Sequence, residues 1–107
     1  MSVIPQITVK ELKQRIDSGN APYIVDVREP FEYQICNIGA PLIPINDVPA
    51  RIDEIPRTGE VVIHCKSGGR SQRVAEFLAQ AGYTNVSNLA GGILAWAEEI
   101  DPKMQKY

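Results

Sequence analysis

The amino-acid sequence predicts an α/β fold in which a mostly parallel sheet is flanked by helices on both faces. Two observations support this prediction. Short apolar runs with the composition of strands alternate along the chain with segments of helical periodicity. The central runs are apolar at nearly every position, which is typical of strands buried on both faces. Because 107 residues suffice for one core and not for two, we expect a single domain over residues 1–107.

An edge strand and a capped helix are expected near the start of the chain. Ile7–Val9 has the composition of a strand, and Thr8 and Glu11 have the spacing of a capping box. The helix that follows is expected to end at Gly19. The apolar residues on its buried face are Val9, Leu12 and Ile16.

The next part of the chain contains a strand, two helical segments and an extended piece. Tyr23–Val27 is nearly all apolar, so we expect a central strand there. Pro30 suits the first turn of a short helix, and Pro41–Pro44 is an extended piece bracketed by prolines. Asn46 is expected to cap a further helix. The residues that this helix would bury are Val48, Ile52 and Ile55.

The stretch from residue 61 to residue 82 is expected to form the functional site. Val61–Ile63 is a β-branched run typical of a buried strand. Residues 65–71 are too short and too rich in glycine to be a strand or a helix. The helix after this loop is expected to stop at Gly82. Its apolar residues repeat with helical period at Val74, Phe77, Leu78 and Ala81.

The end of the chain is expected to add one strand, Val86–Leu89, and a last helix after Gly91–Gly92. That helix carries Ile93 and Trp96. In parallel sheets covered by helices, ligands bind beyond the carboxyl ends of the strands. Cys65 lies at such an end, and it is therefore the first candidate for a functional residue.

The residue types of the loop predict an anion site around a cysteine thiolate. A helix N-terminus and nearby cations lower the pKa of a thiol. Gly68 and Gly69 allow successive backbone N–H groups to point inward as an anion-binding nest. Cationic and hydroxyl side chains are present at Lys66, Ser67, Arg70, Ser71 and Arg73. The alternative is that Cys65 is a small buried apolar residue, as free cysteines usually are.

The spacing between Cys65 and Arg70 bears on the reaction. Cysteine-based phosphatases present His-Cys-x-x-x-x-x-Arg, a loop wide enough for a phosphoryl group. The loop from His64 through Arg70 is one residue shorter. A smaller ring of amides suits one sulfur atom on the cysteine, so the spacing favours sulfur transfer. It disfavours the alternative of a small phosphatase or arsenate reductase.

Four collinear segments resemble the rhodanese family, and the match runs over nearly the whole chain. They are residues 24–33, 65–71, 81–86 and 89–96. The resemblance implies one rhodanese-like domain with a five-stranded parallel sheet. It also implies a sulfurtransferase in which Cys65 takes sulfane sulfur from a donor, thiosulfate or a desulfurase persulfide, and carries it as a persulfide to a nucleophilic acceptor. The backbone amides from Lys66 to Ser71 would stabilise the thiolate, the persulfide and the departing anion.

The ending Ala95–Tyr107 is similar to rhodanese domains fused to adenylyltransferases of molybdopterin and thiamine biosynthesis. This similarity implies a ubiquitin-like sulfur carrier protein or an adenylyltransferase as partner. Gln105 stands where that pattern has proline, and Ile38–Pro41 lacks the proline of the common Ile-Pro-Gly-Ala, so the pathway stays open. The chain is either an excised piece or a free-standing relative. A second hypothesis is a non-catalytic rhodanese-like module that binds a partner while Cys65 is idle.

Several residues near the loop have two interpretations. Asp26 and Arg28 follow a strand's carboxyl end, where they would support the site or form a buried ion pair that fastens the next loop. Arg70 would orient an anionic donor, or pair with Asp26 or another acid and brace the loop. We expect bracing, and we expect Lys66 to meet the donor or acceptor. His64 is expected to pack in the core.

The composition excludes several classes of function. The cysteines, Cys36 and Cys65, are too few for a disulfide framework and predict a reducing, cytoplasmic location. With one histidine they are also too few for a zinc site, and we expect no metal or cofactor. A net charge of −2 and the lack of a long apolar run predict no nucleic-acid or membrane partner. Cys36 is expected to be a packing residue rather than a resolving thiol for Cys65.

Overall fold

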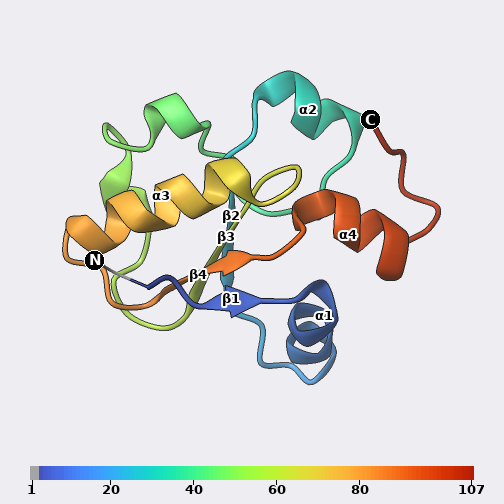
Figure 1. Cartoon of the computed structure of the whole chain (residues 1–107), viewed down its shortest axis with the longest axis horizontal. Helices are drawn as coiled ribbons and strands as arrows, with labels where there is room; N and C mark the ends of the chain where they lie inside the picture. The colour runs from blue at the N-terminus through green and yellow to red at the C-terminus, as the bar shows by residue number, and fades with distance from the viewer. Residues whose placement is uncertain (1–2) are drawn as a thin grey trace.

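The computed structural model describes residues 3–107. Its sheet has four strands: β1 (Gln6–Ile7), β2 (Tyr23–Asp26), β3 (Val61–His64) and β4 (Val86–Leu89). Their order in the sheet is β1-β4-β3-β2 (Figure 1). Every neighbouring pair is parallel, so the carboxyl ends of the strands meet at one edge. Cys65 directly follows β3 at this edge.

The expectation of five strands was wrong by one. The segment Pro41–Pro44 pairs with β2 only through a bridge between Asp26 and Leu42. The amide of Ile43 donates a hydrogen bond to the carbonyl of Asp26 at 2.9 Å. Pro41 has no N–H group to donate toward β2, so the pairing does not extend toward the start of that strand.

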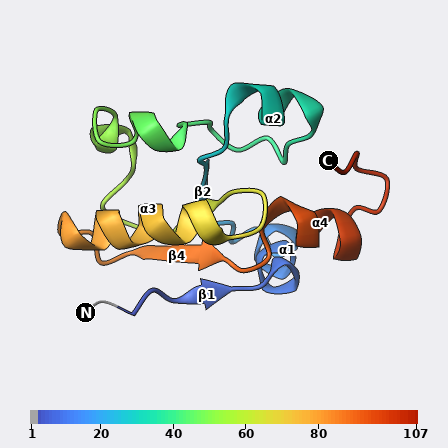
Figure 2. The same cartoon turned by 45° about the horizontal axis from the view of Figure 1, so that its top comes forward.

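Helices cover both faces of the sheet. They are α1 (Val9–Asp17), α2 (Pro30–Ile35), α3 (Gly69–Gln80) and α4 (Gly92–Glu99). Side chains alternate along β3, so Val61 and Ile63 join the core beneath α3, whereas Val62 joins the core beneath α1 and α4. The segment between β2 and β3, which includes α2, lies on the α3 side of the sheet (Figure 2). No helix within residues 3–107 combines the length and the apolar character that a membrane span requires.

The first helix begins as predicted. The side chain of Thr8 accepts a hydrogen bond from the amide of Glu11 at 3.1 Å, and the Glu11 carboxylate accepts one from the amide of Thr8 at 3.0 Å. The capping box is therefore confirmed. Burial of Ile16 was wrong, because this side chain is 36% exposed. It lies in the last turn of α1, past the part of the helix that packs on the core through Val9 and Leu12.

The helix predicted after Asn46 was also wrong. Two short 3₁₀-helices stand in its place, η1 (Ile45–Asp47) and η2 (Ile52–Glu54). Pro49 lies between them, and a proline inside an α-helix removes one hydrogen bond and clashes with the preceding turn. Asn46 lies within η1 and caps nothing. Val48 and Ile55 are buried as expected, and Ile52 is partly buried against the same core.

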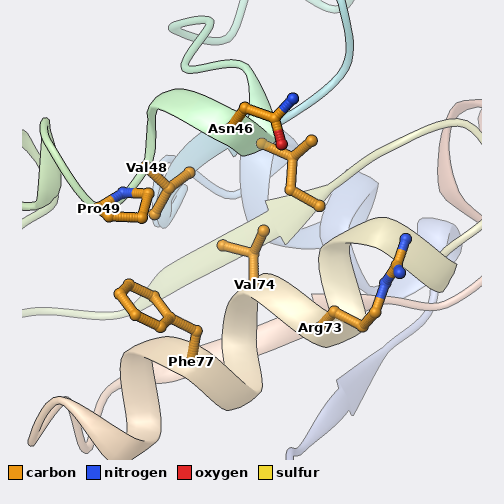
Figure 3. A pocket seen from close by; sticks show the side chains of 7 residues that line it. Asn46, Val48, Pro49, Arg73, Val74 and Phe77 are labelled. Carbon is orange, nitrogen blue, oxygen red and sulfur yellow. The ribbon is translucent and has the colours of Figure 1, made fainter.

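Helix α3 has a different buried face from the one predicted. The residues that it buries are Ser71, Val74, Ala75 and Leu78. Phe77 is 39% exposed and Ala81 is exposed, so these two expectations were wrong. The face toward the sheet runs through Ala75, which leaves Phe77 directed toward Val48 and Pro49 (Figure 3). The stop at Gly82 is confirmed by its positive φ of 99°.

Candidate active site

The loop after β3 turns sharply at Gly68, the N-cap of α3. Gly68 has φ 110° and ψ −9°, a left-handed conformation that side chains disfavour. It also lies close to the end of β4, since a Cβ at this position would be 3.5 Å from the amide nitrogen of Gly91 and 3.6 Å from the carbonyl oxygen of Leu89. The turn directs the first amides of α3 toward Cys65.

Three hydrogen-bond donors converge on the sulfur of Cys65. The amide of Gly68 lies 3.1 Å from Sγ, the amide of Ser71 3.4 Å and the hydroxyl of Ser71 3.3 Å. The amides therefore point inward, as the glycine-rich loop predicts. Cys65 itself is only 1% exposed. The residue as a whole is thus almost entirely covered by its surroundings.

The pKa of the Cys65 thiol is lower than its ordinary value. Burial of the sulfur, the largest single influence, raises the pKa. Hydrogen bonds from the Ser71 hydroxyl and from the amides of Ser71, Gly68 and Ser67 act in the other direction and together outweigh burial. The N-terminus of α3 also favours negative charge here. The loop is thus built to hold a thiolate.

Asn88 of β4 fixes the orientation of Ser71, and sequence reasoning did not identify it. Its Nδ2 donates to the carbonyl of Gly68 at 3.2 Å and to Oε1 of Gln6 at 2.9 Å. These bonds leave its Oδ1 to accept the Ser71 hydroxyl at 2.5 Å. Since a hydroxyl has one proton, Ser71 donates either to Asn88, 2.5 Å away, or to Cys65, 3.3 Å away. When the proton is on the side of Asn88, the sulfur keeps the amides of Gly68 and Ser71 as donors.

We expect Ser71→Ala to raise the pKa of the Cys65 thiol by about one unit, because a hydrogen bond to a charged group contributes about 1.5 kcal/mol or more. The thiolate absorbance near the ultraviolet edge, followed against pH, measures this change. Ser67→Ala is the matched control, because its side chain is exposed and donates no hydrogen bond to the sulfur. Equal titration curves for the two variants would contradict the role of the Ser71 hydroxyl.

The N-terminus of α4 holds the other side of the loop. The amide of Ile93 donates to the carbonyl of Cys65 at 3.0 Å, and the amide of Leu94 donates to the carbonyl of Lys66 at 3.0 Å. Gly92 has φ 58°, and a Cβ there would be 2.6 Å from the carbonyl oxygen of Cys65 and 2.5 Å from that of Lys66. The glycine pair before α4 thus allows the two backbones to touch, a role that the sequence pattern alone does not reveal.

Arg70 braces the loop through an acid on α2. Its guanidinium forms two hydrogen bonds with Glu32, at 2.7 and 2.9 Å. The sequence anticipated such bracing by Asp26 or another acid, and the acid is Glu32. The hydrogen bond from Arg70 is the main reason that the pKa of Glu32 falls to about 2. This pairing leaves Arg70 less available to orient a donor.

Tyr107 lies against this ion pair, and sequence reasoning missed it as well. Its hydroxyl donates to Oε2 of Glu32 at 2.7 Å and accepts from Nη1 of Arg28 at 3.0 Å. Burial is the main reason that the pKa of Tyr107 rises to about 12. The ammonium group of Lys66 lies 4.3 Å from the centre of the Tyr107 ring, a cation–π contact. Lys66 is thereby positioned at the rim of the loop.

Asp26 and Arg28 form a buried ion pair beneath the site. Both side chains are 0% exposed, and Nη2 of Arg28 lies 2.7 Å from Oδ2 of Asp26. Arg28 also donates to the carbonyls of Cys36 at 2.8 Å and Glu32 at 3.3 Å. This geometry agrees with the interpretation of Asp26 and Arg28 as a buried ion pair that fastens the segment around α2. His64 is fully buried, and burial lowers its pKa.

The remaining candidate residues lie apart from the sulfur or bear on it only through the backbone. Ser67 and Gly69 are exposed, and Gly69 is the first residue of α3. Cys36 ends α2 and is half-buried, and both cysteines are free thiols. Within residues 3–107, no group of three or more His, Cys, Asp or Glu side chains is placed to hold a metal ion.

Comparisons with known proteins agree with this geometry. A sulfurtransferase from Allochromatium vinosum is 40% identical over 96 residues, which cover 89% of this chain and 90% of the relative. The probable adenylyltransferase/sulfurtransferase MoeZ of Mycobacterium tuberculosis is 36% identical over 104 residues, or 94% of this chain. The chain spans only 26% of the length of MoeZ.

The fold has close counterparts among solved structures. A rhodanese-like domain protein from Staphylococcus aureus superposes with a TM-score of 0.82 at 32% identity, over 91% of this chain and 95% of that one. The family model for the rhodanese-like domain matches residues 8–99. Together with the parallel sheet and the cysteine at the end of β3, these matches establish that the chain belongs to the rhodanese-like family.

Proposed function

We propose that this chain is a sulfurtransferase that carries sulfane sulfur as a persulfide on Cys65. The observation that carries the proposal is the convergence of the Gly68 amide, the Ser71 amide and the Ser71 hydroxyl on Sγ. Donors arranged in this way stabilise a negative charge on sulfur before and after loading. The sulfurtransferase name of the Allochromatium relative, which this chain matches over most of its length, supports the same reaction.

Each half of the proposed reaction is a displacement at sulfur. The Cys65 thiolate attacks the outer sulfur of the donor, a new S–S bond forms, and the donor leaves with the electron pair of the broken bond. With thiosulfate as donor, the departing anion is sulfite. A nucleophilic acceptor then attacks the outer sulfur of the persulfide, and Cys65 leaves as a thiolate. No external oxidant or reductant is consumed.

The residues around Cys65 have distinct roles in this proposal. The amides from Lys66 to Ser71 stabilise the thiolate and the departing anion, and Ser67, Gly68 and Gly69 supply the backbone of this cradle. Lys66, held over the Tyr107 ring, attracts an anionic donor. Arg70 keeps the loop closed on α2 through Glu32, and the pair Asp26–Arg28 supports it from below.

We expect Cys65→Ser to abolish sulfur transfer, because a hydroxyl does not form the persulfide. Thiocyanate formation from thiosulfate and cyanide measures turnover, and the intact mass of the protein after exposure to a desulfurase and its substrate measures loading. Wild type should gain one sulfur atom, and Cys65→Ser none. Cys36→Ser is the matched control and should load normally. If wild type and Cys65→Ser were equally inactive with every donor, the proposal would be abandoned.

The protein partners of this reaction are also part of the proposal. MoeZ combines adenylyltransferase and sulfurtransferase in its name, and a putative sulfur carrier protein of Bacillus subtilis, YrkF, is 36% identical to this chain over 101 residues. These relatives support an acceptor of the ubiquitin-like sulfur carrier class, with an adenylyltransferase as a further partner. A cytoplasmic site of action, where thiols stay reduced, fits a carrier thiol of this kind.

One observation favours a second candidate function, a non-catalytic module that binds a partner. Cys65 is only 1% exposed, as expected for a thiol that merely fills space. The loading experiment separates the two functions, because an idle thiol gains no sulfur. A Cys65→Ser variant that retains the biological effect, together with a Lys66→Glu variant that loses it, would establish the second function.

A further inference from the structure

A groove opens between η1 and α3. Its volume is about 310 Å³, and its apolar lining includes Val48, Pro49, Val74 and Phe77. Figure 3 shows Phe77 and Pro49 on one side of this groove and Arg73 at the other end, with Val48 and Val74 between them. The exposed part of Phe77, which the helical pattern wrongly assigned to the core, forms one of its walls.

The groove and the candidate active site lie along the same helix, α3. Arg70, Arg73, Val74 and Phe77 have the spacing of residues that share one face of a helix. Arg70 lies in the first turn, beside the cysteine loop. A helix rises about 1.5 Å per residue, so Phe77 lies about 10 Å along the axis from Arg70. An extended chain covers that distance in about three residues.

The end of the groove nearest the loop carries an unpaired positive charge. Arg73 is exposed, and within the described part of the chain no carboxylate lies within ion-pair distance of it. Asn46 adds an exposed amide to the same groove. The groove thus offers an apolar surface followed, toward Cys65, by a cation.

We propose that this groove binds an extended segment of the protein that accepts sulfur from Cys65. The segment places an apolar side chain between Val48 and Phe77 and an acidic side chain beside Arg73. From the distances along α3, its apolar residue stands about three to four residues before the nucleophile. This inference rests on the proposed function, because it assumes that a nucleophile is delivered to a Cys65 persulfide. A small acceptor would have no need of the groove.

The test uses synthetic peptide thiols as acceptors in single turnovers of the persulfide-loaded protein. The reference peptide has leucine four residues and aspartate two residues before a final cysteine, because Phe77 and Arg73 are about 6 Å apart along α3 and alternate residues of an extended chain share one side. Control peptides replace the leucine by serine or the aspartate by lysine. The peptide thiolate attacks the outer sulfur and Cys65 leaves as a thiolate, so the mass of the peptide reports each transfer. Free cysteine, as a small acceptor, gives the reference rate for each protein variant.

Four protein variants localise the effect. We expect wild type to transfer sulfur to the reference peptide about tenfold faster than to the serine peptide, which corresponds to ~1.4 kcal/mol. Phe77→Ala should remove this preference. Arg73→Glu should reverse the charge preference, so that the lysine peptide becomes the better acceptor. The matched controls are Phe31→Ala, which changes an exposed aromatic residue on α2, and Lys10→Glu on α1. Both should keep the preference for leucine over serine and for aspartate over lysine.

Several outcomes would overturn the inference. Equal rates for all peptides, or equal losses in Phe31→Ala and Phe77→Ala, would exclude the groove as the binding surface. Slower loading of Cys65 with unchanged transfer would assign the groove to the donor. A change in sedimentation of Phe77→Ala would assign it to a second copy of the chain.

Failure of the proposed function is distinguished by a binding measurement that needs no persulfide. The fluorescently labelled reference peptide is titrated with the Cys65→Ser protein, with and without Phe77→Ala. If binding depends on Phe77 but the wild-type protein never loads sulfur, the groove is a binding surface and its assignment to a sulfur acceptor is overturned. If the peptide does not bind, the proposal that the groove is a binding surface is overturned.

Discussion

Gly92→Ala is expected to destabilise the protein by about 3 kcal/mol, the sum of a left-handed side-chain conformation and an overpacked contact. The new methyl group would lie 2.5–2.6 Å from the carbonyl oxygens of Lys66 and Cys65. Neither can yield easily, because both accept hydrogen bonds from the first turn of α4. Thermal unfolding measures the effect, and a loss of this size lowers Tm by more than about 10 °C in a domain of this length.

A glycine of the cysteine loop, Gly69, provides the control. Gly69 has a negative φ, and a Cβ there would meet nothing within 4 Å. Alanine also has the higher helix propensity, so Gly69→Ala should leave Tm unchanged or raise it slightly. If Gly92→Ala were as stable as Gly69→Ala, the close packing of α4 on the cysteine loop would be refuted. Sulfur loading of Gly92→Ala should fall even at temperatures where the protein stays folded, because the carbonyls that it displaces belong to the cradle.

Arg28→Met is expected to cost about 3–5 kcal/mol, since it leaves the carboxylate of Asp26 buried without its partner. Arg28 is fully buried and forms hydrogen bonds with Asp26, Cys36, Glu32 and Tyr107. Its loss therefore releases three parts of the chain at once. Unfolding in urea measures the change as a shift in the midpoint at unchanged slope.

The control for Arg28→Met is an arginine in an exposed ion pair. Arg51 bonds to Glu54 at 2.7 Å near the surface, and such pairs contribute less than about 1 kcal/mol, so Arg51→Met should shift the urea midpoint little. Replacing both members of the buried pair, as Arg28→Met with Asp26→Leu, should recover part of the loss because no unpaired charge remains. Equal stability of Arg28→Met and Arg51→Met would contradict the structural role of the buried pair.

The sequence predicted the elements whose signals are local. The capping box at Thr8, the stops at Gly19 and Gly82, and the strands β2, β3 and β4 follow from neighbouring residues and are present. The edge strand expected at Ile7–Val9 was misplaced, because β1 is Gln6–Ile7 and Val9 begins α1. The errors arose where tertiary packing or proline decided the outcome. The prediction of a helix after Asn46 did not take Pro49 into account. The prediction that Phe77 is buried assumed that every apolar residue of α3 faces the sheet.

The sequence predicted the parts of the site formed by consecutive residues of the loop. It did not predict the residues that reach the loop from other parts of the chain. The converging amides follow from Gly68 and Gly69 and the helix start, which are consecutive in sequence. Asn88, Glu32 and Tyr107 are distant in sequence, and no short pattern places them at the loop. The resemblance to the rhodanese family covered the segment around Gly92 without revealing its contact with the Cys65 carbonyl. Contacts of this kind depend on the register of the sheet.

The cysteine loop is anchored largely through peptide groups, since its carbonyls bond to α4 and its amides to the sulfur. These hydrogen bonds do not involve the side chains at positions 66 and 67. Substitutions at these two positions should therefore change the chemistry at the rim of the loop while the hydrogen bonds around the sulfur persist. The framework around the sulfur and the chemistry of the loop's outer surface can thus vary independently of each other.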